Sequence, residues 1–192
     1  MKRIFYLLVL LPLCFGGCKT IKPAAMAKTE ITQNSVTNSD NAPVAVNFSD
    51  QITWLLGYFN LSQLSREPYS VWYVKGFDEY MPGSEALNKL LDIDNTGLSI
   101  KIVLGTWCPD SRREVPRFMK VLDIWQFPVE KLTFIGVDNG KLSPVGEYNQ
   151  LDIQRVPTFI IYKNNIEAGR IIENPVASLE QDMVNILTRN EK

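Results

Sequence analysis

The pattern of apolar and polar positions predicts two helices between residues 49 and 97. Four apolar residues recur at the i, i+3, i+4, i+7 spacing of one helical face: Ile52, Leu55, Leu56 and Phe59. This spacing predicts an amphipathic helix that begins near Asp50. Segment 69–80 combines strand-favouring with turn-forming residues, so its pattern selects neither structure. Ser84 begins a second helical pattern, which the polar turn 92–97 ends.

From residue 98 onward the pattern is that of an α/β domain. A β-rich run, Leu98–Leu104, precedes a long helical pattern with four apolar residues on one face: Val115, Phe118, Met119 and Leu122. Residues 131–137 predict a second buried strand, and runs 158–162 and 168–172 predict an antiparallel hairpin. Ser178 then opens a capping box before the last helix. Because a βαβ crossover joins parallel strands, we expect helices on both faces of one central sheet.

The first residues have the form of a bacterial export signal. Lys2 and Arg3 precede an apolar run, residues 4–15, which is too short to span a bilayer. The run ends in Phe-Gly-Gly-Cys, which resembles a lipobox in which Cys18 is lipidated and becomes the mature N-terminus. The alternative is a plain signal peptide followed by an incidental cysteine. We expect an exported protein that is anchored by lipid in the cell envelope, in the outer membrane facing the periplasm.

Composition divides the chain into three parts. Residues 1–17 are the expected lipoprotein signal peptide. Residues 18–48 comprise Cys18 and a flexible tether, because residues 19–47 contain no aromatic side chain and are rich in polar residues. Residues 49–192 form the expected folded domain, with its core at 98–189.

The net charge and the absence of histidine exclude several classes of function. The 192-residue chain has a formal net charge of -1, so a nucleic-acid partner is not expected. The chain contains no histidine, which removes the commonest general base and the ligand of most zinc and haem sites. We therefore expect no metal and no other cofactor.

Cys108 is the strongest candidate for a reactive side chain. It follows the strand 98–104, and ligands bind at the carboxyl ends of strands in open α/β sheets. At a helix start, unpaired backbone N–H groups and the helix dipole favour the thiolate, so we expect Cys108 to be nucleophilic at neutral pH. Ser111 lies one turn further on and can donate a hydrogen bond to the sulfur.

Residues 105–111 read Gly-Thr-Trp-Cys-Pro-Asp-Ser and resemble the Trp-Cys-x-x-Cys turn of the thioredoxin family, with Ser111 in place of the second cysteine. Pro116 matches the proline that kinks the active-site helix of thioredoxins, and Val156-Pro157-Thr158 matches their cis-proline loop. Residues 69–91 with 112–118 also resemble envelope thioredoxin-like proteins of Bacteroidetes-type bacteria. The resemblance implies a thioredoxin-like three-layer α/β sandwich with a central mixed β-sheet and an N-terminal helical extension.

The resemblance also implies roles for individual residues. Cys108 would be the nucleophile, Ser111 its hydrogen-bond partner and Pro157 the cis-proline that faces it. Substrate, an extended peptide or a protein thiol or disulfide, would be bound by the residues around these two loops: Trp107, Pro109, Asp110, Val156 and Thr158. The alternative for Cys108 is a small buried hydrophobic residue without chemistry, with Pro157 merely starting a strand.

Two departures from thioredoxins change the expected chemistry. Ser111 cannot resolve a mixed disulfide, and once Cys18 is lipidated the mature domain has no second free cysteine. Ile102 also stands where thioredoxins carry a buried acid that assists proton transfer. These departures exclude an autonomous dithiol cycle.

Three functions are consistent with a thioredoxin-like domain that has one cysteine. They include enzymes and a binding module, so the sequence does not decide whether the protein is an enzyme. The first is monothiol exchange of the reductase or isomerase type, which an external thiol completes. The second is a non-catalytic peptide-binding or chaperone-like module. The third is a one-cysteine peroxide reductase or sensor.

Overall fold

The computed structural model describes residues 54–189, which belong to one compact unit. The expected signal peptide, Cys18, the tether and the expected start of the domain at residue 49 lie outside the described residues and stay predictions. The strands are β1 (Gly57–Phe59), β2 (Leu98–Leu104), β3 (Leu132–Gly136), β4 (Thr158–Lys163) and β5 (Ile166–Ile172). The helices are α1 (Ser70–Glu79), α2 (Ser84–Leu91), α3 (Pro109–Ile124) and α4 (Leu179–Thr188), with short 3-10 helices η1 (Leu61–Gln63), η2 (Val129–Lys131) and η3 (Tyr148–Leu151).

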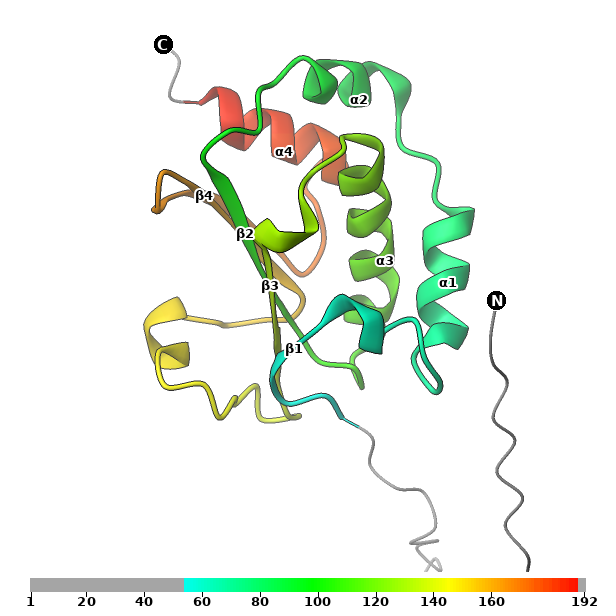
Figure 1. The fold of residues 1–192 in the computed structure, drawn as a ribbon, viewed down its shortest axis with the longest axis vertical. Coiled ribbons are helices and arrows are strands. Elements are labelled where there is room, and N and C mark those ends of the chain that lie inside the picture. Colours follow the sequence, from blue (N-terminus) through cyan, green and yellow to red (C-terminus); the bar gives the residue numbers. More distant parts are fainter. Residues whose placement is uncertain (1–53, 190–192) are drawn as a thin grey trace, which may run out of the picture. The chain divides into compact units, whose positions relative to one another are not determined.

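The strands form one mixed sheet in the order β1-β3-β2-β4-β5 (Figure 1). β2 and β3 are parallel and are joined through α3, whereas β4 is antiparallel to β2 and β5 is antiparallel to β4. This topology confirms the expected α/β sandwich with a central mixed sheet, and it is thioredoxin-like in the order of its strands and in the helix that follows β2. Among residues 54–189, no helix combines the length and the apolar character needed to cross a membrane.

All four α-helices lie on one side of the sheet, where α1 packs on α3 and α2 packs on α4. Alternate residues of the central strands, such as Ile100, Ile102 and Phe159, join the buried side chains of the helices in one core. Within this core the rings of Phe118 and Phe159 stack with their centroids 4.1 Å apart, and both side chains are fully buried. The main core of the domain therefore lies between the sheet and the helices.

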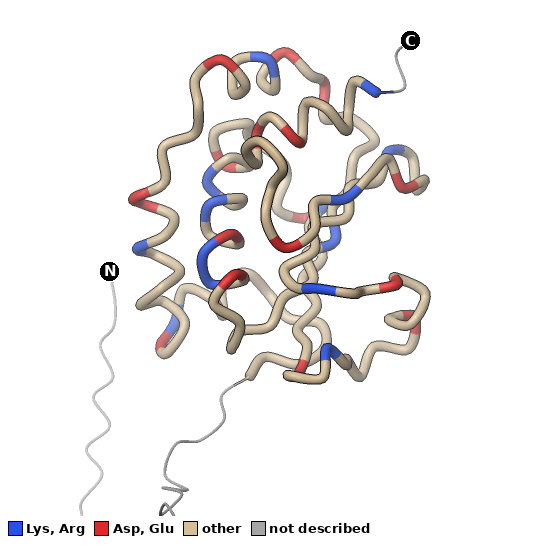
Figure 2. Tube along the Cα trace, turned by 180° about the vertical axis from the view of Figure 1, so that it is seen from behind, with Lys and Arg blue, Asp and Glu red and all other residues tan. Residues whose placement is uncertain are grey.

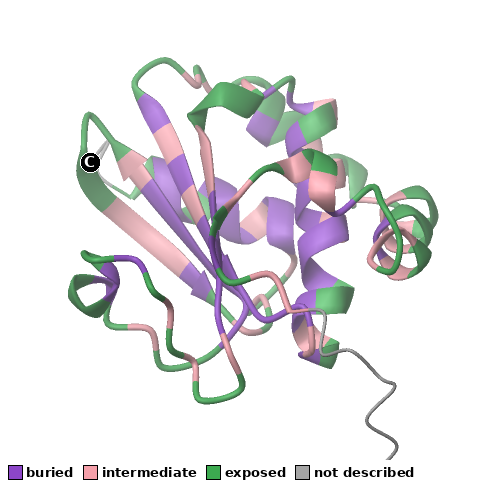
Figure 3. Cartoon of the chain, turned by 60° about the horizontal axis from the view of Figure 1, so that its bottom comes forward, coloured by how far each residue is buried: buried purple, intermediate pink, exposed green. Residues whose placement is uncertain are grey.

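The opposite face is covered by the segment that connects β3 to β4. Its inner side chains, including Tyr148 and Leu151 of η3, pack on Val103, Ile135 and Ile160 of the sheet. The expectation of helices on both faces was therefore wrong for the described residues. The connection contains Gly140, Pro144 and Gly146, which disfavour helix, and Figure 3 shows this segment as mostly exposed or half-buried.

The N-terminal part of the domain differs from the sequence prediction in two places. Residues 57–59 form β1, an edge strand antiparallel to β3, where the spacing of apolar residues predicted a helix. Gly57 has φ +72, outside the helical region, and pairing with the sheet edge overrides the local pattern. Segment 70–79, which the pattern left unassigned, is helix α1. Together α1 and α2 form the expected helical extension before β2.

The C-terminal hairpin and helix follow the sequence prediction closely. β4 and β5 are joined by Asn164 and Asn165, which both have positive φ, the conformation that two-residue hairpin turns require. Ser178 caps α4, and its hydroxyl accepts a hydrogen bond from the Gln181 backbone N–H at 3.2 Å. These signals are local, so the sequence alone was sufficient to place both elements.

Candidate functional site

Cys108 lies where the chain turns from the central strand into the longest helix. It is the N-cap residue of α3, and Pro109 occupies the first helical turn, where its missing N–H costs nothing. The Cys108 backbone N–H donates to the carbonyl of Gly105 at 2.9 Å, which closes the loop after β2. Cys108 is the only cysteine among the described residues, and 7% of its surface is exposed.

The loop before β4 faces Cys108, as the resemblance implied. The Val156–Pro157 peptide bond is cis, and the Cys108 thiol donates a hydrogen bond to the carbonyl of Val156 across 3.4 Å. Two motifs that are 48 residues apart in the sequence thus meet at the sulfur. The arrangement brings together Cys108, Val156 and Pro157, three of the residues predicted for the site.

A groove of about 380 Å³ opens beside the sulfur. Three of its lining residues were predicted from the sequence: Trp107, Cys108 and Val156. Four more were not: Lys141, Gln154, Arg155 and Glu173. Gln154 and Arg155 directly precede Val156, so extending that motif by two residues would have found them. Lys141 and Glu173 come from separate loops, and no local signal marks them.

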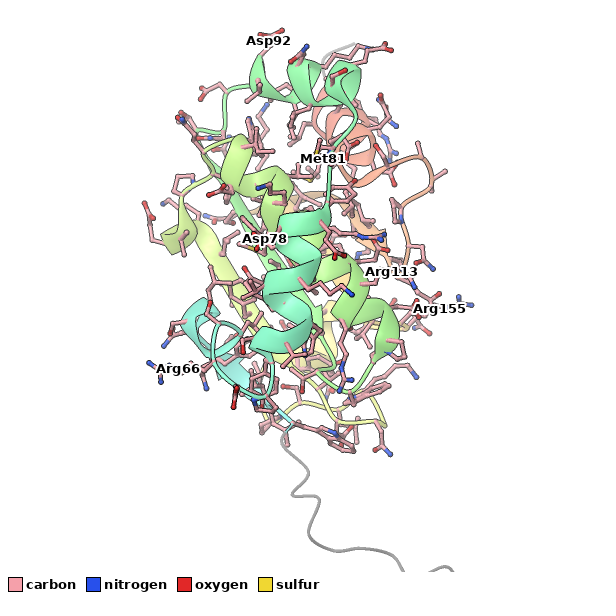
Figure 4. The ribbon with its side chains drawn as sticks, turned by 90° about the vertical axis from the view of Figure 1, so that its right-hand side faces the viewer. Arg66, Asp78, Met81, Asp92, Arg113 and Arg155 are labelled. Atoms are coloured by element: carbon pink, nitrogen blue, oxygen red, sulfur yellow. The ribbon has the colours of Figure 1, made fainter. Side chains whose placement is uncertain are left out.

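Charged side chains form one wall of this groove. Arg155 and Glu173 are paired, with 2.5 Å between the guanidinium nitrogen and the carboxylate oxygen. The backbone N–H of Glu173 donates to the carbonyl of Pro157 at 2.7 Å, so the loop after β5 is fixed to the cis-proline loop. Figure 4 shows that Arg155 and Arg113 project from the same side of the molecule.

Trp107 forms the apolar wall and is held firmly. Its indole N–H donates to the carbonyl of Val137 at 3.0 Å. Its ring lies over Gly105, where a Cβ atom would come within 2.6 Å of the ring. The ring of Trp54 contacts it from another direction, with a centroid distance of 6.4 Å and an interplanar angle of 54°. The groove therefore has a wall of fixed shape next to Cys108.

Ser111 is fully buried in the first turns of α3. Its hydroxyl oxygen accepts a hydrogen bond from the Gly105 backbone N–H at 3.3 Å, which ties the helix to the loop after β2. Its expected hydrogen bond to the Cys108 sulfur stays a prediction. Nearby, Arg112 donates from Nε to the carbonyl of Thr106 at 2.7 Å.

The other residues predicted to bind substrate surround the groove without lining it. Pro109 is exposed, and Asp110 accepts a hydrogen bond from Arg113 at 2.6 Å. Thr158 is buried, and its hydroxyl donates to the carbonyl of Arg155 at 2.7 Å. Contacts between these three residues and a substrate stay predictions.

Two of the basic residues of α3, Arg113 and Arg117, form ion pairs within the helix. Figure 2 shows the basic residues of α3 as a blue run along the helix, interrupted by red. Glu114 is buried and accepts hydrogen bonds from Arg113 at 2.6 Å and from Arg117 at 3.3 Å. Arg113 and Arg117 are therefore paired with carboxylates of their own helix.

The central strand β2 contains no acidic residue. Ile102, which stands where thioredoxins carry one, is fully buried in the core between the sheet and the helices. Within residues 54–189, no group of three or more histidine, cysteine, aspartate or glutamate side chains could hold a metal ion.

Comparison with known proteins establishes no family. No protein-family model and no curated protein matches the chain. A solved protein of unknown function from Pseudomonas aeruginosa is similar at 15% identity and a TM-score of 0.43, over 64% of this chain and 81% of that one. Thioredoxin O2 from Arabidopsis thaliana, solved in its oxidized state, is similar at 22% identity and a TM-score of 0.36, over 54% and 84%.

A mutant thioredoxin from Halobacterium salinarum is also similar, at 10% identity and a TM-score of 0.34, over 59% of this chain and 89% of that one. Similarities at this level assign no activity. The strand order, the helix after β2 and the cis-proline opposite Cys108 together give the chain a thioredoxin-like α/β fold.

Proposed function

We propose that this chain is a thiol–disulfide exchange protein of the cell envelope that acts through Cys108. One observation carries the proposal: the single cysteine of the described domain stands at a helix start, opposite a cis-proline, on the wall of an open groove. A cysteine that served only as a core residue would not need a groove beside its sulfur. In our proposal the protein is exported and is anchored by lipid on Cys18 in the outer membrane, facing the periplasm.

The first step would be attack by the Cys108 thiolate on a substrate disulfide. Sγ gives up the proton that it now donates to the carbonyl of Val156, and this proton passes to solvent. A bond forms between Sγ and one substrate sulfur while the substrate S–S bond breaks. The second substrate sulfur leaves as a thiolate with the electron pair and takes a proton from water.

The second step would need a thiol from outside the domain, because Ser111 cannot attack a mixed disulfide. An external thiolate attacks the substrate sulfur of the mixed disulfide, forms a new S–S bond with it and releases the Cys108 thiolate. If a different thiolate of the same substrate attacks instead, not the one just released, it forms a new S–S bond, frees the Cys108 thiolate and leaves a rearranged disulfide. The same site thus supports reductase-type and isomerase-type exchange, depending on which thiol reaches it.

The two walls of the groove suit an extended polypeptide. The indole of Trp107 offers an apolar surface, and Lys141 with the Arg155–Glu173 pair offers polar groups elsewhere on the lining. Side chains of an extended peptide alternate in direction, so one strand can use both kinds of wall. Extended peptide and protein disulfides are therefore the proposed substrates.

Trapping of mixed disulfides in cells tests this proposal. Cells that produce the wild-type chain or Cys108→Ser are quenched with acid, and their proteins are analysed under non-reducing conditions by mass spectrometry. We expect a partner protein or a small thiol in disulfide linkage to Cys108 in the wild type and none in Cys108→Ser. A wild-type Cys108 that carries no adduct, even during oxidative stress, would count against thiol exchange.

A second function is favoured by a different observation. The sulfur is only 7% exposed, and its proton is directed at the carbonyl of Val156, so the groove could hold peptide without any thiol chemistry. Binding of reduced, unfolded polypeptides to wild type and Cys108→Ala separates the two functions. Equal affinities combined with no adduct on Cys108 would favour the chaperone-like module.

A further inference from the structure

The chain that leads into β1 runs beneath the Cys108 loop. The Leu55 backbone N–H donates to the hydroxyl of Thr106 at 3.3 Å, two residues before Cys108. At Gly136, the last residue of β3, a Cβ atom would lie 2.0 Å from the Leu55 carbonyl oxygen, so the two backbones touch. These contacts fix the backbone of residue 55 and thereby the position of its neighbour, Trp54.

The ring of Trp54 forms an aromatic pair with the ring of Trp107. The indole N–H of Trp107 is directed at Val137, and one side of the ring is closed by Gly105. Trp54 supplies the third contact, a tilted aromatic pair with centroids 6.4 Å apart. Trp107 lines the Cys108 groove, whereas Trp54 is not among the residues that line it. Trp54 can therefore act on the groove through its contact with the Trp107 ring.

The same entering segment also contacts the connection between β3 and β4. The Tyr58 hydroxyl of β1 donates to the carboxylate of Glu147, and this bond raises the pKa of Tyr58. Glu147 directly precedes Tyr148, whose hydroxyl donates to the carbonyl of Lys141, a residue of the groove wall, at 2.7 Å. Residues 54–58 thus contact Trp107 directly, and they are linked to Lys141 through Glu147 and Tyr148.

We propose that Trp54 is a positioning residue of the Cys108 site, which holds the Trp107 ring against the groove and so limits the size of the disulfide that reaches the sulfur. The inference rests on the proposed function, because it concerns which substrates Cys108 attacks. Without the Trp54 ring, the Trp107 ring gains space on the side away from the groove. The groove then widens, and a bulky disulfide gains more than a small one.

The test compares the reaction of Cys108 with two disulfides of different size. Hydroxyethyl disulfide is the small probe and dithiobis(nitrobenzoate) the bulky aromatic one. Each reacts with the full chain, and the label on the peptide that contains Cys108 is followed by mass spectrometry. The ratio of the bulky to the small rate constant cancels the intrinsic reactivity of the Cys108 thiol, and comparing this ratio between variants cancels the intrinsic reactivity of each probe.

We expect Trp54→Ala to raise this ratio by about two- to tenfold, the factor that corresponds to one aromatic contact. Trp54→Phe keeps a ring at this position and should restore most of the wild-type ratio. Both variants should change the near-ultraviolet circular dichroism bands that a coupled pair of indoles gives. Trp125→Phe is the matched control, because Trp125 caps the opposite end of α3 and should leave the ratio unchanged.

Failure of this inference is distinguishable from failure of the proposed function. If Cys108 reacts in every variant with an unchanged ratio, Trp54 has no positioning role while thiol exchange stands. If Cys108 of the wild type reacts with neither probe, the proposed function itself is wrong. If Trp54→Ala does not fold, the ratio in Trp54→Phe and Trp54→Leu decides, since loss of the aromatic ring in Trp54→Leu should still raise it.

Discussion

The two faces of the central sheet differ in what covers them and in what they do. One face lies under four α-helices and holds the larger core, in which Phe118, Phe159 and Leu122 are almost completely buried. The other lies under an irregular connection, and its smaller cluster includes Cys108 and Val156 of the candidate site. The helical face can supply most of the stability, which leaves the irregular face free to form a groove. Binding residues are commonly found on loops that a rigid scaffold positions.

Truncation of a core ring should show the largest difference between the faces. Phe118→Ala removes a ring that stacks on Phe159 at 4.1 Å, and we expect a loss of about 3–5 kcal/mol in the free energy of unfolding. Leu151→Ala, on the irregular face, should cost about 2 kcal/mol, because an irregular connection can relax around the cavity. Urea unfolding of both variants measures these values. Equal losses would show that the two faces contribute alike to stability.

A substitution at Gly105 should disturb the site more than the core. A Cβ atom there would lie 2.6 Å from the Trp107 ring, so Gly105→Ala must displace the ring or the loop. We expect a loss of about 1–3 kcal/mol, typical of overpacking, together with altered near-ultraviolet circular dichroism. Gly146→Ala is a suitable control, since a Cβ atom there meets nothing within 4 Å. An unchanged spectrum for Gly105→Ala would mean that Trp107 is not held as described.

The sequence predicted those parts of the fold and site that depend on local patterns. Strand β2, helix α3, the hairpin and the cap of α4 all follow from the spacing of apolar residues or from turn and cap residues. The pairing of Cys108 with the cis-proline loop was also expected, because the motifs around both residues resemble those of thioredoxins. Local patterns were sufficient for the helices, strands and cap, whereas the pairing of Cys108 with the cis-proline loop came from the resemblance alone.

The parts that sequence reasoning missed depend on contacts between distant residues. The helical spacing of residues 52–59 was misleading, because Gly57 and the edge of β3 turn the end of this segment into a strand. Lys141 and Glu173 reach the groove only through the folding of two separate loops. The pairing of Trp54 with Trp107 joins residues that are 53 positions apart, and no periodicity indicates it.

Removal of one hydroxyl on the irregular face should have a moderate effect. Tyr148→Phe deletes the hydrogen bond of 2.7 Å to the carbonyl of Lys141, which holds one wall of the groove. We expect a loss of about 0.5–1.5 kcal/mol at neutral pH and faster reaction of Cys108 with bulky disulfides. Urea unfolding and the two disulfide probes measure the two effects. A loss of stability without a change in the rate at which Cys108 reacts would show that this wall does not control access to the sulfur.

At neutral pH the smallest effect is expected at a buried tyrosine on the helical face, where the difference in stability appears only at high pH. Burial raises the pKa of Tyr73 from 10.0 to about 12, with a smaller contribution from the charge of Asp123. Above pH 10 the unfolded chain releases this proton while the folded chain keeps it, so the stabilising contribution, complete below pH 10, is lost as the pH approaches 12. Tyr73→Phe cannot release a proton, so its stability should match that of the wild type near pH 7 and fall less steeply above pH 10. Urea unfolding across this range tests the difference, and parallel losses in both proteins would show that Tyr73 does not contribute to the alkaline instability of the helical face.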